Sequence, residues 1–466
     1  MQQIAFDPAD PRAALAQLPH AAAVFALYGA EAHAEPYIGR TPNLRARLER
    51  LLQPSAKHPR RLQLAGRVRR IEFRLTGSDF ESLLLQFELL EEIYGPKTLD
   101  RMHLGAPAFI RYLGSNAYPR ITVTNRPSQR EADWAYGPFQ SRASAERFAD
   151  EALKLFLLRR CTDDLDPNPA HPGCVYSEMK MCLAPCYQGC TDERYSEESS
   201  AVESFLATRG ESRLVTLRTQ RDQASANLAF EAAAALHSQV QRAEAVRALA
   251  PELVRPMSQL RAVILQASAN PDEVAVFLYQ DSRLSGPATF STLGMRIQNE
   301  RSGSSSLFAH PMAIEPIPET AESQRIVEHL SEIPESEAQK CQGTTSVVPK
   351  IDQNESRALA AAEPPTNHPT KLPRSLLESR LEAALATLAE PRQAPSATIR
   401  QGHLALLKRW YYRPEVRRAG EIFFPDSDDS EGHWPIKPIL RGIGRVAAKQ
   451  LKPSPATPQE NLSPAP

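Results

Sequence analysis

No stretch of this 466-residue sequence approaches the roughly 18 consecutive apolar residues that a membrane-spanning helix needs. The opening residues, MQQIAFDPADPRAALAQL, also lack the basic region and long apolar run of a secretion signal. Both absences argue against a membrane or secreted protein. We therefore expect a cytoplasmic location and no membrane partner.

Net charge is absent as well, because 55 Lys and Arg residues balance 55 Asp and Glu residues. Only local charge can therefore indicate a polyanionic or polycationic partner. Cysteine is scarce, with six residues in the whole chain. Structural disulfides are uncommon in a cytoplasmic protein, so these cysteines favour metal or redox chemistry. Cys-x2-Cys pairs, from which zinc ribbons and knuckles are usually built, are missing.

Proline, by contrast, is abundant, with 40 residues that crowd the second half of the chain. Residues 301–370 combine proline with serine and glutamate and show weak periodicity, which predicts a disordered linker. Residues 451–466 predict a disordered tail. The chain length is compatible with roughly two to four domains around these segments.

The N-terminal part of the chain predicts a compact α/β unit over residues 20–98, preceded by a loose lead-in over residues 1–20. Its expected elements, in order, are the strands AAAVFALYG and PYIG, the helix NLRARLERLL, the strand IEFRL and the helix SLLLQFELLEEIYG. Ser78 and Glu81 have the spacing of a capping box at the start of the last helix.

The rest of the chain completes a multidomain α/β protein. We expect a connecting α/β segment at 99–160, in which AYPRITVT is a strand and YGPFQS a turn before a helix that continues to Cys161. The further expected segments are a cysteine-rich segment at 161–190, a helical hairpin at 212–248, a small β-rich segment at 258–300 and a basic, aromatic α/β segment at 371–450.

Five of these segments, taken in order, resemble the UvrC family of excinuclease proteins, which act in bacterial nucleotide excision repair. AVFALYGAEAHAEPYIG and NLRARL resemble the signature and following helix of a GIY-YIG nuclease. Three further stretches complete the series: AYPRITVT with YGPFQS, the cysteine stretch CVYSEMKMCLAPC, and ASANLAFEAAAALHSQV, which is similar to the UVR hairpin. The resemblance covers roughly residues 20–290. It implies a DNA-repair protein that binds DNA, makes the 3′ incision and meets the UvrB protein of the excinuclease through residues 212–248.

The remainder departs from the family pattern. We find no acidic constellation that would supply the second, ribonuclease-H-like nuclease of a complete family member. LRGIGRVAAKQL contains a Gly-Ile-Gly that is typical either of a helix-hairpin-helix module or of a plain loop before a surface helix.

The resemblance assigns nuclease-site roles to individual residues. Tyr37 takes the place of the second-strand tyrosine, Arg47 that of the helix arginine, and Arg40 that of a lysine. Phe25 replaces the first tyrosine, and Gln86 replaces the glutamate that would bind Mg²⁺ or Mn²⁺; an amide holds such hard cations poorly. Glu88 and Glu81 lie roughly 200° and 140° round the helix from Gln86, so we do not expect either to substitute. Three hypotheses follow: a nuclease that acts in repair, a catalytically impaired DNA-binding adaptor, or a nuclease that acts outside repair.

Local charge favours DNA binding whichever hypothesis holds. Residues 40–74 contain eleven Lys or Arg residues against two Glu residues, a local charge of +9. The expected DNA-binding residues are Arg45, Arg50, Lys57, Arg60, Arg61, Arg67, Arg69 and Arg70. A second candidate surface is KRWYYRPEVRR, whose aromatic residues could stack on unpaired bases or could be core residues.

Four cysteines form a candidate metal site: Cys161, Cys174, Cys182 and Cys186, separated by 12, 7 and 3 residues. From the residues alone, four thiolates at this uneven spacing are compatible with an iron–sulfur cluster or with zinc. The resemblance favours a [4Fe–4S] cluster on these four. It leaves Cys190 and Cys341 outside the site.

Overall fold

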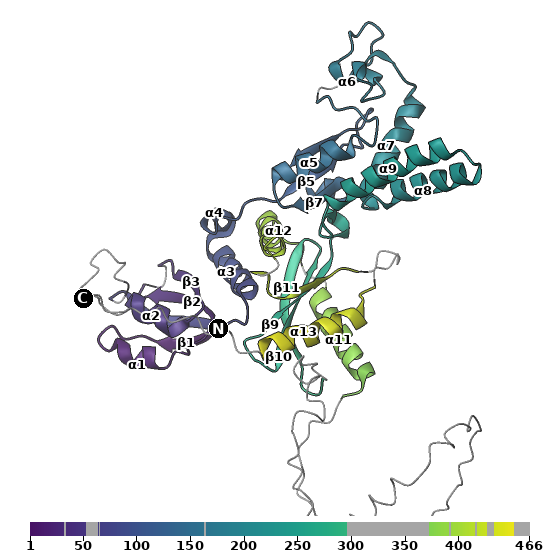
Figure 1. Cartoon of the computed structure of the whole chain (residues 1–466). Helices are drawn as coiled ribbons and strands as arrows, with labels where there is room; N and C mark the ends of the chain where they lie inside the picture. Colours follow the sequence, from purple (N-terminus) through teal and green to yellow (C-terminus); the bar gives the residue numbers. More distant parts are fainter. Residues whose placement is uncertain are drawn as a thin grey trace, which may run out of the picture. The chain divides into compact units, whose positions relative to one another are not determined.

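The computed structural model describes residues 1–31, 34–52, 64, 66–162, 165–295, 372–390, 393–414, 417–425 and 433–451. The linker expected at 301–370 and nearly all of the tail expected at 451–466 lie outside these residues, as do Lys57, Arg60, Arg61 and Cys341. The described chain is a mixture of helices and strands, with three four-stranded sheets (Figure 1). No helix in the described part of the chain combines the length and the apolar composition that a membrane span requires.

The N-terminal domain is built on an antiparallel sheet in the order β1-β4-β2-β3, drawn in purple in Figure 1. Its elements are β1 (Gln2–Ala5), α1 (Pro11–Ala16), β2 (Ala23–Gly29), β3 (Tyr37–Thr41), α2 (Leu44–Leu52) and β4 (Val68–Leu75). The expectation of a loose lead-in is wrong. β1 pairs with β4, and Phe6, Leu15 and Leu18 are buried in the same core as the sheet, so residues 1–20 are part of the domain.

The helix α3 (Asp79–Tyr94) follows β4 and begins as the sequence predicts. The Ser78 hydroxyl accepts a hydrogen bond from the Glu81 N–H at 3.1 Å, and the Glu81 carboxylate accepts one from the Gly77 N–H at 2.8 Å. The Ser78 hydroxyl thus satisfies a backbone donor that the first turn of a helix leaves unpaired. The Glu81 carboxylate binds the N–H of Gly77, one residue before the N-cap, rather than that of Ser78, so the reciprocal bond of a capping box is not formed.

The middle domain has a sheet in the order β6-β5-β7-β8. Between α3 and this sheet lie η1 (Gly95–Lys97) and α4 (Thr98–Arg101). The strands are β5 (Ala108–Tyr112), β6 (Ile121–Thr124), β7 (Ala135–Phe139) and β8 (Arg255–Pro256), with η2 (Gln129–Trp134) before β7 and α5 (Arg142–Ala152) after it.

Two expectations for the middle domain are wrong. The stretch expected to be a turn contains β7, which pairs with β5 and is buried along its length. The helix expected to reach Cys161 ends at Ala152, because Phe156 and Leu158 enter the core from non-helical backbone.

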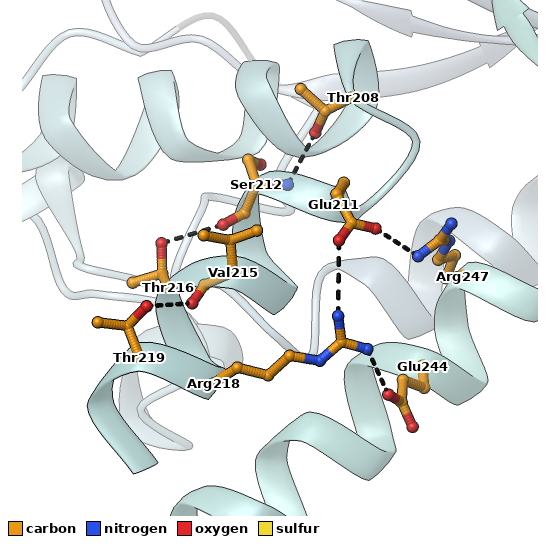
Figure 2. A network of polar contacts seen from close by, with 9 residues as sticks. All are labelled: Thr208, Glu211, Ser212, Val215, Thr216, Arg218, Thr219, Glu244 and Arg247. Atoms are coloured by element: carbon orange, nitrogen blue, oxygen red, sulfur yellow. Dashed lines mark hydrogen bonds and ion pairs between the residues drawn. The ribbon is translucent and has the colours of Figure 1, made fainter. Parts of the chain in front are cut away.

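The described residues of the cysteine-rich segment form two short helices, α6 (Val175–Glu178) and η3 (Pro185–Tyr187), before the long helix α7 (Asp192–Ala207). The expected helical hairpin is present as α8 (Glu211–Ala226) and α9 (Phe230–Ala248). Ion pairs join the two helices, as Figure 2 shows: Arg218 of α8 lies between Glu211, at 3.5 Å, and Glu244 of α9, at 2.7 Å. Arg247 of α9 also pairs with Glu211.

The C-terminal domain joins two stretches that the sequence analysis treated separately. Its sheet has the order β11-β10-β9-β12, built from β9 (Ala262–Ala267), β10 (Glu273–Gln280), β11 (Arg283–Ser291) and β12 (Glu421–Phe423). The helices are η4 (Met257–Gln259), α11 (Arg374–Ala389), α12 (Ala397–Tyr411) and α13 (Ile436–Gln450). Apolar residues of α11 and α13 share one core with β9 and β10, so 258–300 and 371–450 belong together.

The Gly-Ile-Gly of the C-terminal domain forms neither a helix-hairpin-helix turn nor a loop. Both glycines lie inside the continuous helix α13. A Cβ atom on Gly442 would lie 2.6 Å from the Phe423 ring, so the glycine allows close packing of α13 on β12.

Candidate functional site

The N-terminal sheet brings Phe25 and Tyr37 side by side. Their rings are 6.2 Å apart, and Phe25 is 1% exposed. Phe25 lies opposite Gly39 across the β2–β3 pair, where a Cβ atom on the glycine would come within 2.8 Å of the Phe25 ring. Phe25 therefore packs over Gly39 as a core residue, and it has no hydroxyl with which to help deprotonate a water.

Arg40 is held by an ion pair rather than left free to meet a phosphate. Its guanidinium contacts the carboxylate of Asp79, the first residue of α3. The same carboxylate accepts a bond from Arg413, just beyond α12, at 2.6 Å. Sequence reasoning missed this cluster because Asp79 and Arg413 are 334 residues apart.

Arg47 and Gln86 lie on α2 and α3 respectively, and both side chains are half-buried. Among the described residues, the Arg47 guanidinium has no hydrogen-bond or ion-pair partner in the structure, so it stays a candidate phosphate ligand. Among the described residues, neither side chain forms a hydrogen bond or an ion pair with Tyr37, and their catalytic roles stay predictions.

Neither nearby glutamate supplies the missing carboxylate. Glu81 is 7% exposed, and its carboxylate accepts the Gly77 N–H just before α3. Burial raises the pKa of Glu81, against the opposing effects of the Gly77 N–H and Arg74. Glu88 is exposed and makes an interaction of its own. The part of the chain that the structure describes holds no group of three or more His, Cys, Asp or Glu side chains arranged to bind a metal ion.

The basic residues of the N-terminal domain divide into two groups. Arg45 donates to the backbone oxygens of Leu15, at 3.1 Å, and Ala16, so it holds the end of α1. Arg70 lies 4.2 Å from the Tyr28 ring and pairs with Glu72 at 3.1 Å. The remaining described members of the predicted set, Arg50, Arg67 and Arg69, are exposed. We expect these three to be the stronger candidates for DNA contact.

The four predicted metal-binding cysteines lie within electrostatic range of one another. Burial raises the pKa of the Cys182 thiol, and the charges of Cys174, Cys186 and Cys161 raise it further. Cys190 is half-buried beside Asp192 and Arg194, and its charge does not contribute to the raised pKa of Cys182 or of Cys186.

A buried arginine supports one end of the cysteine group. Arg159 is 3% exposed, and its guanidinium donates to the Cys161 sulfur at 3.5 Å and to the Tyr118 carbonyl at 2.9 Å. Such a donor stabilises a thiolate, the form that binds metal. The sulfur donors therefore suit an iron–sulfur cluster or zinc by their chemistry, although the described residues do not gather three of them into an arrangement that would bind a metal ion.

The aromatic residues of the C-terminal basic segment belong to the core. Trp410 is 2% exposed, and its indole N–H donates to the Ala419 carbonyl at 3.0 Å. The Tyr412 hydroxyl donates to the Pro138 carbonyl at 2.9 Å. Stacking of Trp410 on unpaired bases is therefore excluded, because the ring is covered by protein.

Comparison with known proteins gives the class of the middle domain. Residues 109–205 match the family model described as the UvrC/Cho excinuclease middle domain. This stretch contains β5, β6, β7, α5, the cysteine-rich segment and nearly all of α7.

Curated relatives are similar to a longer part of the chain. UvrABC system protein C of Alcanivorax borkumensis is 28% identical over 256 residues, 54% of this chain and 41% of the relative. The protein of the same name from Aliivibrio fischeri is 27% identical over 235 residues, 50% of this chain and 38% of the relative. About half of the chain is thus similar to UvrABC system protein C of these organisms, and the chain spans about two fifths of the length of those relatives. No solved structure matches the chain.

Proposed function

We propose that this chain acts in nucleotide excision repair as a UvrC-type DNA-binding adaptor with a catalytically impaired GIY-YIG domain. The homologous middle domain supports the repair assignment. The observation that carries the impairment is the pair of substituted positions: Phe25 is a buried core residue without a hydroxyl, and Gln86 offers no carboxylate to a divalent ion. The ion pair of Arg40 with Asp79 adds to this, because it engages the guanidinium at the nuclease position.

Incision on the 3′ side of a lesion is the second candidate function. Tyr37 and Arg47 favour it, since a hydroxyl and an unpaired guanidinium could orient water and stabilise a phosphorane. Catalysis would still need a divalent ion, and Gln86 offers only a neutral oxygen to it. Such a nuclease could also act outside repair.

The partners of the adaptor would be DNA and the UvrB protein of the excinuclease. The hairpin of α8 and α9 supports the second partner, because it carries large apolar side chains into solvent at its turn. Leu228 is 71% exposed and Phe230 is 65% exposed. Leu228 has a φ of +59°, so the turn itself places this side chain at the tip.

A nicking assay on damaged duplex with the UvrA and UvrB proteins, in Mg²⁺ and in Mn²⁺, tests the proposal. We expect background incision by the wild type and by Arg47→Ala. The double variant Phe25→Tyr/Gln86→Glu should gain roughly 10²-fold, the scale on which one positioned acid–base group acts. Robust wild-type cleavage that Arg47→Ala abolishes would refute the adaptor. Background cleavage by the double variant would contradict the assignment of the impairment to Phe25 and Gln86.

We also propose that Cys161, Cys174, Cys182 and Cys186 hold a [4Fe–4S] cluster, with zinc as the alternative. When bound, either would cross-link a segment that has little apolar core of its own. Protein purified without oxygen should be brown and contain about four iron and four sulfide per chain. Cys182→Ser should lose the iron, whereas the matched variant Cys190→Ser should keep it. Colourless wild-type protein that contains about one zinc per chain would show that the four thiolates bind zinc and not an iron–sulfur cluster.

A further inference from the structure

The helix α13 carries a row of positive charges along one side. Four of its residues are Lys or Arg, and none is Asp or Glu. The four follow one another at intervals of four residues, and all are exposed: Lys437, Arg441, Arg445 and Lys449. At the pitch of an α-helix they extend over about 18 Å and turn through about 120° of the helix surface. We call these four residues the basic stripe.

The other side of α13 fixes the direction in which the basic stripe points. Ile439, Ile443 and Val446 are buried in the core that α13 shares with β9 and β10. The centre of the buried side lies roughly 160° round the helix from the centre of the basic stripe. The helix therefore has no apolar face left to insert into a lipid surface, which disfavours a membrane as the partner.

The charge of the basic stripe is only partly neutralised. Arg445 pairs with Glu421 of β12 at 2.5 Å. Lys437, Arg441 and Lys449 form no ion pair with any described residue. Four positive charges and the one negative charge of Glu421 leave a net charge of +3. Such a row of cations on a fixed helix complements a polyanion.

A glycine beside the cations is not explained by the packing of α13. Gly444 lies inside the helix, where glycine is less favourable than alanine. Gly442 is required by the Phe423 ring, whereas a Cβ atom on Gly444 would have no other atom within 4 Å. Gly444 lies about 20° round the helix from Lys437 and about 60° from Arg441. It leaves the helix backbone open next to the cations, where the backbone of a partner could approach closely.

We propose that the basic stripe of α13 binds the sugar–phosphate backbone of duplex DNA, and that Gly444 allows the close approach. Lys and Arg side chains that neutralise phosphates release condensed counterions, which makes the binding depend on salt. The surface is separate from residues 40–74, where the sequence predicts DNA binding. It rests on the proposed DNA-binding function and adds a second contact region to it.

Fluorescence anisotropy of a labelled duplex, titrated with the full chain over a range of salt, tests the basic stripe. Lys437→Gln/Arg441→Gln/Lys449→Gln should weaken binding roughly 10–100-fold and lower the salt slope by about one per lost contact. Lys437→Arg/Arg441→Lys/Lys449→Arg keeps the charge and should keep the wild-type slope, because phosphate contacts of this kind depend on charge rather than on shape.

The matched control removes the same charge from three other helices: Arg142→Gln/Arg194→Gln/Arg374→Gln. Each of these arginines is exposed and already paired with a glutamate on its own helix. The control should bind duplex as the wild type does. Equal duplex binding by the triple Gln variant of the basic stripe and by the control would overturn the basic stripe and leave the proposed function intact.

Gly444 has a test of its own, in which binding and folding are expected to change in different directions. Gly444→Ala should raise the thermal midpoint and keep the affinity for duplex. Gly444→Leu should weaken duplex binding severalfold at a midpoint no lower than that of the wild type, since the site has room for the side chain until DNA approaches. Equal affinities of the wild type and both variants would overturn the close approach at Gly444.

Inorganic polyphosphate, measured by calorimetry, separates the basic stripe from the proposed function. A wild type that binds no duplex would refute DNA binding altogether. If that protein still bound polyphosphate, and the triple Gln variant did not, the basic stripe would be a site for a free polyanion, and its assignment to DNA would be overturned.

Discussion

Replacing Trp410 with alanine should lower the free energy of unfolding of the C-terminal domain by about 3–5 kcal/mol, the range for deletion of a large buried aromatic. The Trp410 ring lies 5.5 Å from that of Phe80 of α3, in a core shared with β9 and β10. Its removal would leave a cavity and would take away one of the two donors to the Ala419 carbonyl, which would keep the bond from the Gln266 side-chain amide at 3.1 Å.

The matched control for Trp410 is Leu376→Ala on α11, whose side chain is 45% exposed. That change should alter the free energy of unfolding by less than about 0.5 kcal/mol. A multidomain chain need not unfold in one step, so urea unfolding should be followed by circular dichroism together with limited proteolysis. Equal unfolding curves for the two variants would place Trp410 outside the core and reopen its role in base stacking.

Acid should destabilise the C-terminal domain through His403, which is 3% exposed. Burial, with a smaller contribution from Arg283, lowers the pKa of His403 to about 3. The His403 Nδ1 atom accepts a hydrogen bond from the Leu284 N–H at 2.9 Å, and Nε2 is buried without a partner among the described residues. Protonation of Nδ1 would break this bond and leave a charge in the core.

The pH window follows from the two pKa values of His403. The unfolded chain takes up a proton below about 6.5, the ordinary value, whereas the folded protein resists protonation down to about 3. The unfolded state therefore binds more protons across this range, so stability is complete above about 6.5 and decreases as the pH falls toward 3. The expected loss is several kcal/mol.

His403→Gln tests this linkage, because a glutamine oxygen can accept the Leu284 N–H without titrating. Its free energy of unfolding should vary with pH less than that of the wild type. His237→Gln, at an exposed position of α9, is the matched control and should keep the wild-type profile. If His403→Gln and the wild type gave the same pH profile, His403 would not be the group responsible.

The two substituted positions of the nuclease site show how far the sequence alone reaches. Phe25 and Gln86 are visible as departures from a motif, and this already puts catalysis in doubt. The ion pair of Arg40 is not visible, because Asp79 belongs to α3 and Arg413 to the far end of the chain. The doubt could thus be predicted from the sequence, but this further cause of it could not.

The sequence by itself determined the features that depend on near neighbours. The Ser78–Glu81 cap and the boundaries of α8 and α9 follow from spacings of three or four residues, which fix local backbone hydrogen bonds. Only the tertiary structure decided which distant segments share a core. The pairing of β12 with β9 and the burial of Trp410 depend on apolar surfaces that are more than a hundred residues apart in the sequence. The residues around one such surface do not indicate which distant surface it packs against.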